Sequence, residues 1–267
     1  MKFFITSLIF LQTFNISAQL EVKTFYESTK NGYEIFVDNN EICPISIEFK
    51  FKLTNLKSVN GTKQIYVIPA QSKKYKVTDL VIIKPNSPFK MSYETLANYG
   101  DHFLTNYDEN YLYELPYSKG KKYMVGQGYN GPFSHQNQNA IDFTMPIGSD
   151  IAAARAGVVV KIVQKNNSVC AEKRCNEYNN FILILHSDGT FSEYSHIKQN
   201  GALVKKGDKI EVGQLIAKSG NVGWSNGPHL HFVVYIQRLN ERITLKTKFI
   251  TSSGQVDILE PKNEYEK

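Results

Sequence analysis

The sequence predicts an all-β protein built from two units, and three patterns lead to that prediction. Residues 45–53 alternate strictly between apolar and polar side chains, which is the period of a strand with one buried face. Residues 158–163 and 181–185 are runs of β-branched and apolar residues, which are typical of buried strands. In the second half of the chain glycines mark tight turns, and apolar residues rarely recur with the 3.6-residue period of a helix.

The first 18 residues of this 267-residue chain have the pattern of an export signal rather than of a folded element. Lys2 provides a positive charge, residues 3–14 form a short apolar stretch, and Ser17-Ala18 offers small residues for cleavage before Gln19. The stretch is shorter than the roughly 20 apolar residues of a membrane-spanning helix, and no later segment is suited to stable membrane insertion. We therefore expect an exported protein, periplasmic or extracellular.

Residues 19–115 are expected to form an amino-terminal unit that resembles a β-sandwich, followed by a connector. The alternation of residues 45–53 places five apolar side chains on one face of a strand. Shorter strand-like runs, bounded by glycine and proline, follow as far as residue 83. From residue 86 the sequence has no clear period, and we expect a connector with one helical turn near residues 93–99. The unit contains no constellation of catalytic residues, which indicates a structural or positioning role.

The second unit, residues 116–255, has closely spaced strands and is expected to consist of antiparallel hairpins in a two-layer or barrel-like sheet. Residues 256–267 are predicted to form a polar tail. Cys170 and Cys175 can close a small disulfide loop in an oxidising compartment, although two free thiols would also suit their positions. Cys43 would then be unpaired and buried.

The charge of the chain argues against nucleic-acid binding. The formal net charge is +6, from 31 lysine and arginine residues against 25 acidic ones, and the lysines are scattered rather than gathered in one stripe. Weak attraction to an acidic polymer follows from this balance, but a specific nucleic-acid partner does not. The sequence leaves the oligomeric state open.

The most specific chemical signal is His229-Leu230-His231, at the start of a predicted strand. Side chains at positions i and i+2 of a strand project from the same face, so the two imidazoles enter one space while Leu230 faces the core. One imidazole can bind a metal ion at about 2 Å, and the other then lies close enough to act on a water molecule beside the ion. Two unrelated surface histidines would give the same local pattern.

A second group of polar residues lies in and before the apolar segment at residues 140–145. Asp142 stands between Ile141 and Phe143, and an acidic side chain in an apolar strand is costly unless it is paired or binds a metal. His135 precedes it in a loop that could fold back over the carboxylate. Two histidines and one carboxylate form a tetrahedral zinc site with one open position, which is the arrangement of catalytic rather than structural zinc.

The three remaining histidines differ in their settings. His196 ends a strand that is predicted from the alternation of residues 190–195. His186 lies at a hairpin turn before Gly189, and we expect it to be structural. His102 lies in the connector beside Asp101, where an exposed histidine is more often inert than a ligand.

Together these segments resemble the lysostaphin/LytM-type zinc endopeptidases, which cleave peptide bonds in bacterial peptidoglycan. The resemblance covers roughly residues 117 to 236, in the order and spacing of His135…Asp142, Tyr194-Ser195-His196-Ile197, Ser219-Gly220-Asn221-Val222-Gly223 and Gly227-Pro228-His229-Leu230-His231-Phe232. It implies a duplicated-hybrid-motif fold, a twisted antiparallel β catalytic domain with one zinc ion in a groove. The implied ligands are His135, Asp142 and His231, and the implied catalytic residues are His196 and His229. Six residues separate His135 from Asp142, whereas many family members have three.

The resemblance implies an exported zinc-dependent endopeptidase whose partners are peptidoglycan peptides. The chain has no HExxH motif, which excludes a thermolysin-type mechanism. Which of His196 and His229 is the general base stays open. Two other functions also stay open: a non-cutting wall-binding or partner-activating module of the same fold, and a zinc protease that acts on free proteins. The sequence does not indicate which cross-link is cleaved, whose wall is cut, or whether the amino-terminal domain is inhibitory.

Overall fold

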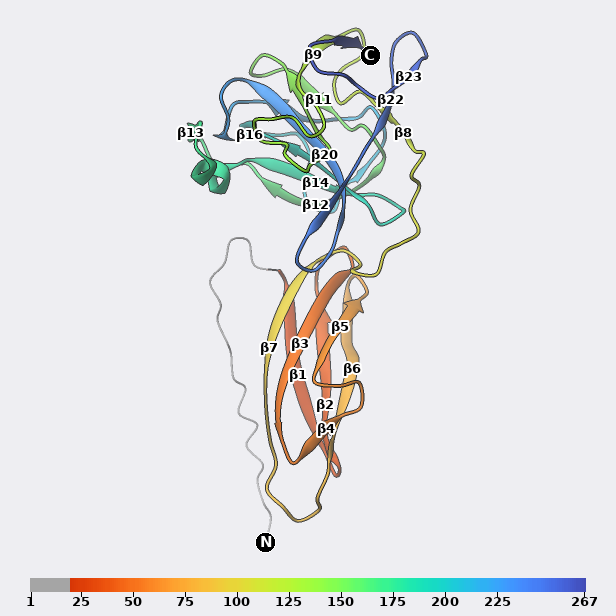
Figure 1. Ribbon diagram of the computed structural model, residues 1–267, viewed down its shortest axis with the longest axis vertical. Helices are drawn as coiled ribbons and strands as arrows, with labels where there is room; N and C mark the ends of the chain where they lie inside the picture. The colour runs from red at the N-terminus through yellow and green to blue at the C-terminus, as the bar shows by residue number, and fades with distance from the viewer. Residues whose placement is uncertain (1–19) are drawn as a thin grey trace.

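The computed structural model describes residues 20–267, so the expected signal segment lies outside the described residues. Within that range almost all regular structure is strand, and η1 (Lys173–Tyr178), a short 3-10 helix, is the one helical element. The all-β prediction is therefore confirmed. No helix in residues 20–267 has the length and apolar content to cross a bilayer. The strands form two units that follow one another along the long axis of the molecule (Figure 1).

The amino-terminal unit contains two antiparallel sheets that share one core. The first sheet has the order β1-β2-β6-β4, formed by β1 (Val22–Thr29), β2 (Gly32–Asn39), β6 (Ser72–Ile82) and β4 (Leu56–Ser58). The second has the order β5-β3-β7, formed by β5 (Lys63–Ile68), β3 (Ile45–Thr54) and β7 (Lys90–Tyr99). Ile35 and Val37 of β2 and Ile47 and Phe49 of β3 belong to the same apolar cluster.

The expectation of a helical turn near residues 93–99 is wrong, because these residues belong to strand β7. The whole of β7 pairs with β3, from Ile45 opposite Tyr99 to Thr54 opposite Lys90. Tyr93 and Ala97, which lie on one face of β7, pack against the apolar core of the unit. A strand with one partly buried face is thus formed although its sequence pattern is weak, because the edge of β3 supplies hydrogen-bond partners.

The second unit is dominated by a nine-stranded curled sheet of antiparallel pairs. Its order is β17-β12-β14-β15-β20-β10-β9-β24, and β21 also pairs with β20. The strands are β9 (Lys122–Gln127), β10 (Ala140–Thr144), β12 (Gly157–Val163), β14 (Phe181–Leu185), β15 (Phe191–Ser195), β17 (Lys209–Ile210), β20 (His229–Gln237), β21 (Arg242–Leu245) and β24 (Glu264–Glu266). A smaller sheet of β11 (Asp150–Ala152), β18 (Leu215–Ser219) and β16 (Ile197–Ala202) completes the core. The predicted antiparallel arrangement of this unit is confirmed.

Both ends of this unit are tied into its sheets. Strand β8 (Leu112–Glu114), just before the expected boundary at residue 116, pairs in parallel with β22 (Lys248–Ile250), which also pairs with β23 (Val256–Asp257). The residues expected to form a polar tail include β24, whose backbone pairs with β9. The Tyr117 hydroxyl donates a hydrogen bond to the Tyr265 carbonyl at 2.7 Å, so the end of the chain is bound to the start of the unit.

The two faces of strand β20 pack against two different apolar clusters. Leu230, Phe232 and Val234 lie in the main core of the second unit. The residues between them face the other way, where Val233 and Tyr235 form a second apolar cluster that includes Cys43 of the amino-terminal unit. The face of β20 that begins with His229 and His231 therefore ends at the junction between the two units.

A charged contact reinforces this junction. The Lys206 ammonium lies 2.8 Å from the carboxylate of Glu41, which is 1% exposed, and 3.1 Å from that of Glu21. The Glu41 carboxylate also accepts a hydrogen bond from the backbone N–H of Glu21 at 2.9 Å. Lys206 belongs to the loop before β17, so this contact joins two segments that are far apart in the sequence.

Replacing Lys206 with methionine is expected to lower the free energy of unfolding by about 1–3 kcal/mol, because the buried Glu41 carboxylate loses its cation. Urea denaturation of the two proteins measures this difference. Lys205→Met is the matched control, since Lys205 is exposed and makes no ion pair within residues 20–267. Equal stability of the two methionine variants would show that the contact does not contribute.

Candidate metal centre and active site

The register of two neighbouring strands places the first pair of site residues. In the antiparallel pair β10–β20, Asp142 lies directly opposite His231. Directly opposed residues project from the same face of a sheet, so both side chains enter the same space. The Asp142 Oδ1 atom lies 2.9 Å from His231 Nδ1.

His135 reaches the same point from the loop that precedes β10. Its side chain is 0% exposed, and its Nε2 atom lies 3.3 Å from Asp142 Oδ1 and 3.2 Å from His231 Nδ1. The loop is closed by its own backbone hydrogen bonds, from Asn130 N to Gln138 O at 2.9 Å and from Gln138 N to His135 O at 2.8 Å. The longer spacing between His135 and Asp142 therefore does not separate them.

These three side chains fit a metal ion. One donor atom from each lies within 4.8 Å of the others: an imidazole nitrogen of His135, a carboxylate oxygen of Asp142 and an imidazole nitrogen of His231. His135 Nδ1 donates to the Gly128 carbonyl at 3.0 Å, which leaves the Nε2 lone pair facing the other two donors. Two imidazoles and a carboxylate are a donor set that zinc commonly takes.

The electrostatics of the cluster are those of an ionised acid among histidines. Burial alone would raise the pKa of Asp142, but hydrogen bonds from His135 and His231 outweigh burial and hold that pKa well below its usual range. Burial alone would lower the pKa of His135, and its hydrogen bond to Asp142 raises it instead. Asp142 is therefore a carboxylate at neutral pH, which is the form that can bind a metal.

His196 and His229 lie together beside this cluster. Their ring centroids are 4.5 Å apart, and His229 Nε2 is 3.8 Å from Asp142 Oδ1. Each donates its Nδ1–H to a backbone carbonyl, His196 to Val222 at 2.7 Å and His229 to Gly227 at 2.8 Å. Burial lowers the pKa of His196 to about 3 and also lowers that of His229. Both rings are therefore neutral near pH 7, with a free Nε2 lone pair.

The sequence comparison agrees with this arrangement. Residues 136–243 match the profile of Peptidase family M23, a range that begins one residue after His135 and includes the other four site residues. Residues 136–243 are an M23 peptidase domain.

Two relatives of the M23 domain are named as endopeptidases. The chain is 35% identical over 99 residues to the peptidoglycan DD-endopeptidase ShyA of Vibrio cholerae, a match that covers 37% of this chain and 20% of ShyA. It is 31% identical over 164 residues to the glycyl-glycine endopeptidase ALE-1 of Staphylococcus capitis, covering 59% of this chain and 38% of ALE-1. The chain thus spans less than two fifths of the length of either relative.

A solved structure with a similar segment is the catalytic domain of the antimicrobial peptidase lysostaphin from Staphylococcus simulans. The sequence identity is 29%, the match covers 43% of this chain and 80% of that domain, and the TM-score is 0.33.

One polar residue of the M23 domain site was not found by sequence reasoning. Gln127, at the end of β9, donates from Nε2 to Asp142 Oδ2 at 3.0 Å and to Ser134 Oγ at 2.9 Å. Its Oε1 accepts the backbone N–H groups of Phe133 at 3.0 Å and Ser134 at 3.2 Å. Gln127 therefore holds the Asp142 carboxylate and the His135 loop in one hydrogen-bond network. No sequence motif marked it, because its partners meet only in the folded chain.

Replacing Gln127 with alanine is expected to weaken metal binding by about 10- to 100-fold, the usual effect of losing a residue that orients metal ligands. Competition with a chromogenic chelator measures this affinity. Gln199→Ala is the matched control, because Gln199 is exposed and, among residues 20–267, its side-chain amide bonds only to the Lys165 carbonyl, at 2.9 Å. An unchanged affinity in Gln127→Ala would mean that Asp142 and His135 are oriented without it.

The other histidines and the cysteines lie where the sequence suggested. His186 is buried, donates to the Ala156 carbonyl at 2.7 Å, and has a pKa lowered by burial to about 4, which fits a structural role. His102 accepts the backbone N–H of Leu239 at 3.2 Å, away from the metal-binding cluster. Cys170 and Cys175 form a disulfide, and Cys43 is free and buried, as predicted.

Proposed function

We propose that this chain is an exported zinc-dependent endopeptidase that hydrolyses peptide bonds in bacterial cell-wall peptidoglycan. The observation that carries this proposal is the convergence of donor atoms from His135, Asp142 and His231 beside two neutral imidazoles. ShyA and ALE-1, both named as endopeptidases, support a peptide substrate. The Cys170–Cys175 disulfide supports export, because disulfides persist in oxidising compartments.

One zinc ion per chain would be held by His135 Nε2, Asp142 Oδ1 and His231 Nδ1. When bound there, zinc supplies Lewis acidity, which polarises the scissile carbonyl and lowers the pKa of a water molecule toward about 7. Gln127 and the Gly128 carbonyl hold the ligands in orientation through the hydrogen bonds described above.

His196 and His229 would move the proton. Because the Nδ1–H of each is engaged by a backbone carbonyl, only Nε2 is free, and at neutral pH it accepts rather than donates. One of the two takes a proton as the oxygen of water bonds to the carbonyl carbon. The protonated imidazole then supplies a proton to the amine nitrogen as the C–N bond breaks.

Mass analysis of the fragments released from purified peptidoglycan tests this function, with residues 19–267 as the enzyme. Peptide cleavage products are expected with zinc and are expected to disappear with a chelator. Zinc-bound protein that associates with peptidoglycan but releases nothing would instead be a non-cutting wall-binding module. Cleavage of unfolded proteins but not of peptidoglycan would identify a zinc protease of free proteins.

A further inference from the structure

Two aromatic side chains stand in the groove beside the metal-binding cluster without a role in the proposed chemistry. Phe133, two residues before His135, and Trp224 both line the groove, with ring centroids 6.1 Å apart and an interplanar angle of 41°. Phe133 is 52% exposed. An apolar ring left this accessible inside a groove indicates a contact surface for a ligand rather than a packing element. We call Phe133 and Trp224 the aromatic edge.

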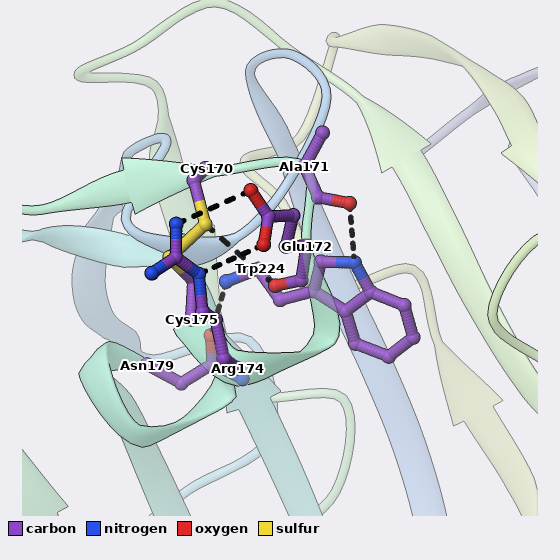
Figure 2. Close-up of a disulfide and its surroundings, with 7 residues drawn as sticks. All are labelled: Cys170, Ala171, Glu172, Arg174, Cys175, Asn179 and Trp224. Atoms are coloured by element: carbon purple, nitrogen blue, oxygen red, sulfur yellow. Dashed lines mark hydrogen bonds and ion pairs between the residues drawn. A yellow bond between two sulfur atoms is a disulfide. The ribbon is translucent and has the colours of Figure 1, made fainter.

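The disulfide loop holds Trp224 in place, as Figure 2 shows. Its indole Nε1–H donates to the Ala171 carbonyl at 3.0 Å, and its backbone N–H donates to Asn179 Oδ1 at 3.0 Å. Ala171 lies inside the loop closed by Cys170 and Cys175. The short strands β13 (Val169–Cys170) and β19 (Gly223–Trp224) also pair in parallel, with Cys170 opposite Trp224.

The close approach of the Asn179 side chain to the backbone beside Trp224 requires glycine at position 223. Its φ is +92°, and a Cβ atom at this position would lie 1.7 Å from Asn179 Oδ1. Only glycine allows both the backbone conformation and the close approach of the Asn179 side chain. Because the loop already satisfies the polar N–H of the indole, Trp224 has only the apolar surface of its ring to offer to a ligand.

The groove around the aromatic edge is rich in carboxamides and poor in free charge. Seven residues with amide side chains line it: Gln127, Gln136, Asn137, Gln138, Asn176, Asn179 and Asn226. Among its charged residues, Glu193 and Arg242 pair with each other at 2.9 Å, Asp142 belongs to the metal-binding cluster, and Lys173 is left. Carboxamides both donate and accept, so they match hydroxyl and acetamido groups, whereas a charged peptide would need opposite charges.

A pyranose ring has this combination of properties, with a face of C–H groups and a rim of hydroxyls. From the aromatic edge, its carboxamide surroundings and its anchoring by the disulfide loop, we infer that Phe133 and Trp224 bind an amino-sugar ring of the peptidoglycan glycan strand. The inference rests on the proposed function, because it assumes that the peptide to be cut is attached to a glycan. It adds a second point of attachment, beside the cleavage site, that selects glycan-linked peptides.

The binding can be measured directly because Trp224 is the only tryptophan of the chain. Titration of the zinc-loaded protein with β-1,4-linked oligosaccharides of N-acetylglucosamine is expected to give a saturable change in tryptophan fluorescence. Phe133→Ala is expected to weaken this binding by about 3- to 10-fold, the usual effect of one aromatic contact. Phe103→Ala is the matched control, because Phe103 is 58% exposed and lies outside the groove.

The disulfide gives a second, independent variant. Cys170→Ser combined with Cys175→Ser is expected to weaken oligosaccharide binding while zinc content stays at about one per chain, because the metal ligands lie on other segments. Trp224→Leu lacks tryptophan fluorescence, so its binding is measured by co-sedimentation with glycan strands whose peptides have been removed. It is expected to lose most of the binding that the unmodified protein shows.

Several results would contradict the inference. One is the absence of both a fluorescence response and co-sedimentation, and another is an equal effect of Phe133→Ala and Phe103→Ala. A response to free stem peptides but not to the oligosaccharide would assign the aromatic edge to the peptide. None of these measurements depends on hydrolysis, so a protein that binds the sugar but cuts nothing would overturn the proposed function alone.

Discussion

Replacing His231 with alanine is expected to remove zinc and hydrolytic activity together. His231 Nδ1 lies 2.9 Å from Asp142 Oδ1, and without it only His135 and Asp142 remain as donors. Two donors are fewer than the three that catalytic zinc sites use. Metal analysis and peptidoglycan hydrolysis, measured on the same preparation, test this result.

The control for this variant is a histidine outside the cluster. His102→Asn is expected to keep both zinc and activity, because His102 lies near Leu239 and its acceptor role can be taken over by an amide oxygen. Zinc retained in His231→Ala would show that His231 is not a ligand, and the roles of the two histidines of β20 would then be reversed.

Replacing His229 with alanine is expected to lower turnover by about 10²- to 10⁴-fold while most of the zinc stays bound, which is the usual effect of losing a positioned acid or base. His229 Nε2 is 3.8 Å from Asp142 Oδ1, and His229 is not part of the three-donor cluster. His196→Ala is expected to behave in the same way, because the two rings adjoin and neither completes the cluster.

Zinc content and turnover of His196→Ala, His229→Ala and His231→Ala, prepared in parallel, separate the two roles. Circular dichroism of each variant shows that a lost activity does not come from unfolding. Equal zinc loss in His229→Ala and His231→Ala would contradict the division into ligand and proton carrier. Full turnover in both His196→Ala and His229→Ala would remove these residues from the mechanism.

Sequence reasoning predicted those strands whose own residues alternate clearly between apolar and polar side chains. The alternation of residues 45–53 predicted β3, and the pattern of His229, Leu230 and His231 predicted two imidazoles on one face, because a strand with one buried face must alternate. The convergence of His135 on Asp142 needed the family resemblance, since a loop has no period from which its path can be derived.

What the sequence did not indicate depends on partners distant in the chain. Strand β7 carries Ser92, Glu94 and Leu96 on the face opposite its core side and forms because β3 offers an edge. Strand β24 has three residues and is held by β9. The contact of Tyr235 with the cluster around Cys43 is also invisible in the local pattern, because its alternation fits a strand whether or not another unit covers that face.

The opposition of Asp142 and His231 across β10 and β20 has a consequence for how such a site tolerates insertions and deletions. Loss of a single residue within either strand would turn one ligand to the opposite face of the sheet, because successive side chains alternate. The loop that carries His135 is under no such restriction, because successive side chains of a loop do not alternate between two faces. Its own hydrogen bonds and those of Gln127 keep it closed. Length changes should therefore accumulate between His135 and Asp142 but not within the strands. Loop exchange at residues 136–139, several of which line the groove, is a route to altering the groove while all three ligands are kept.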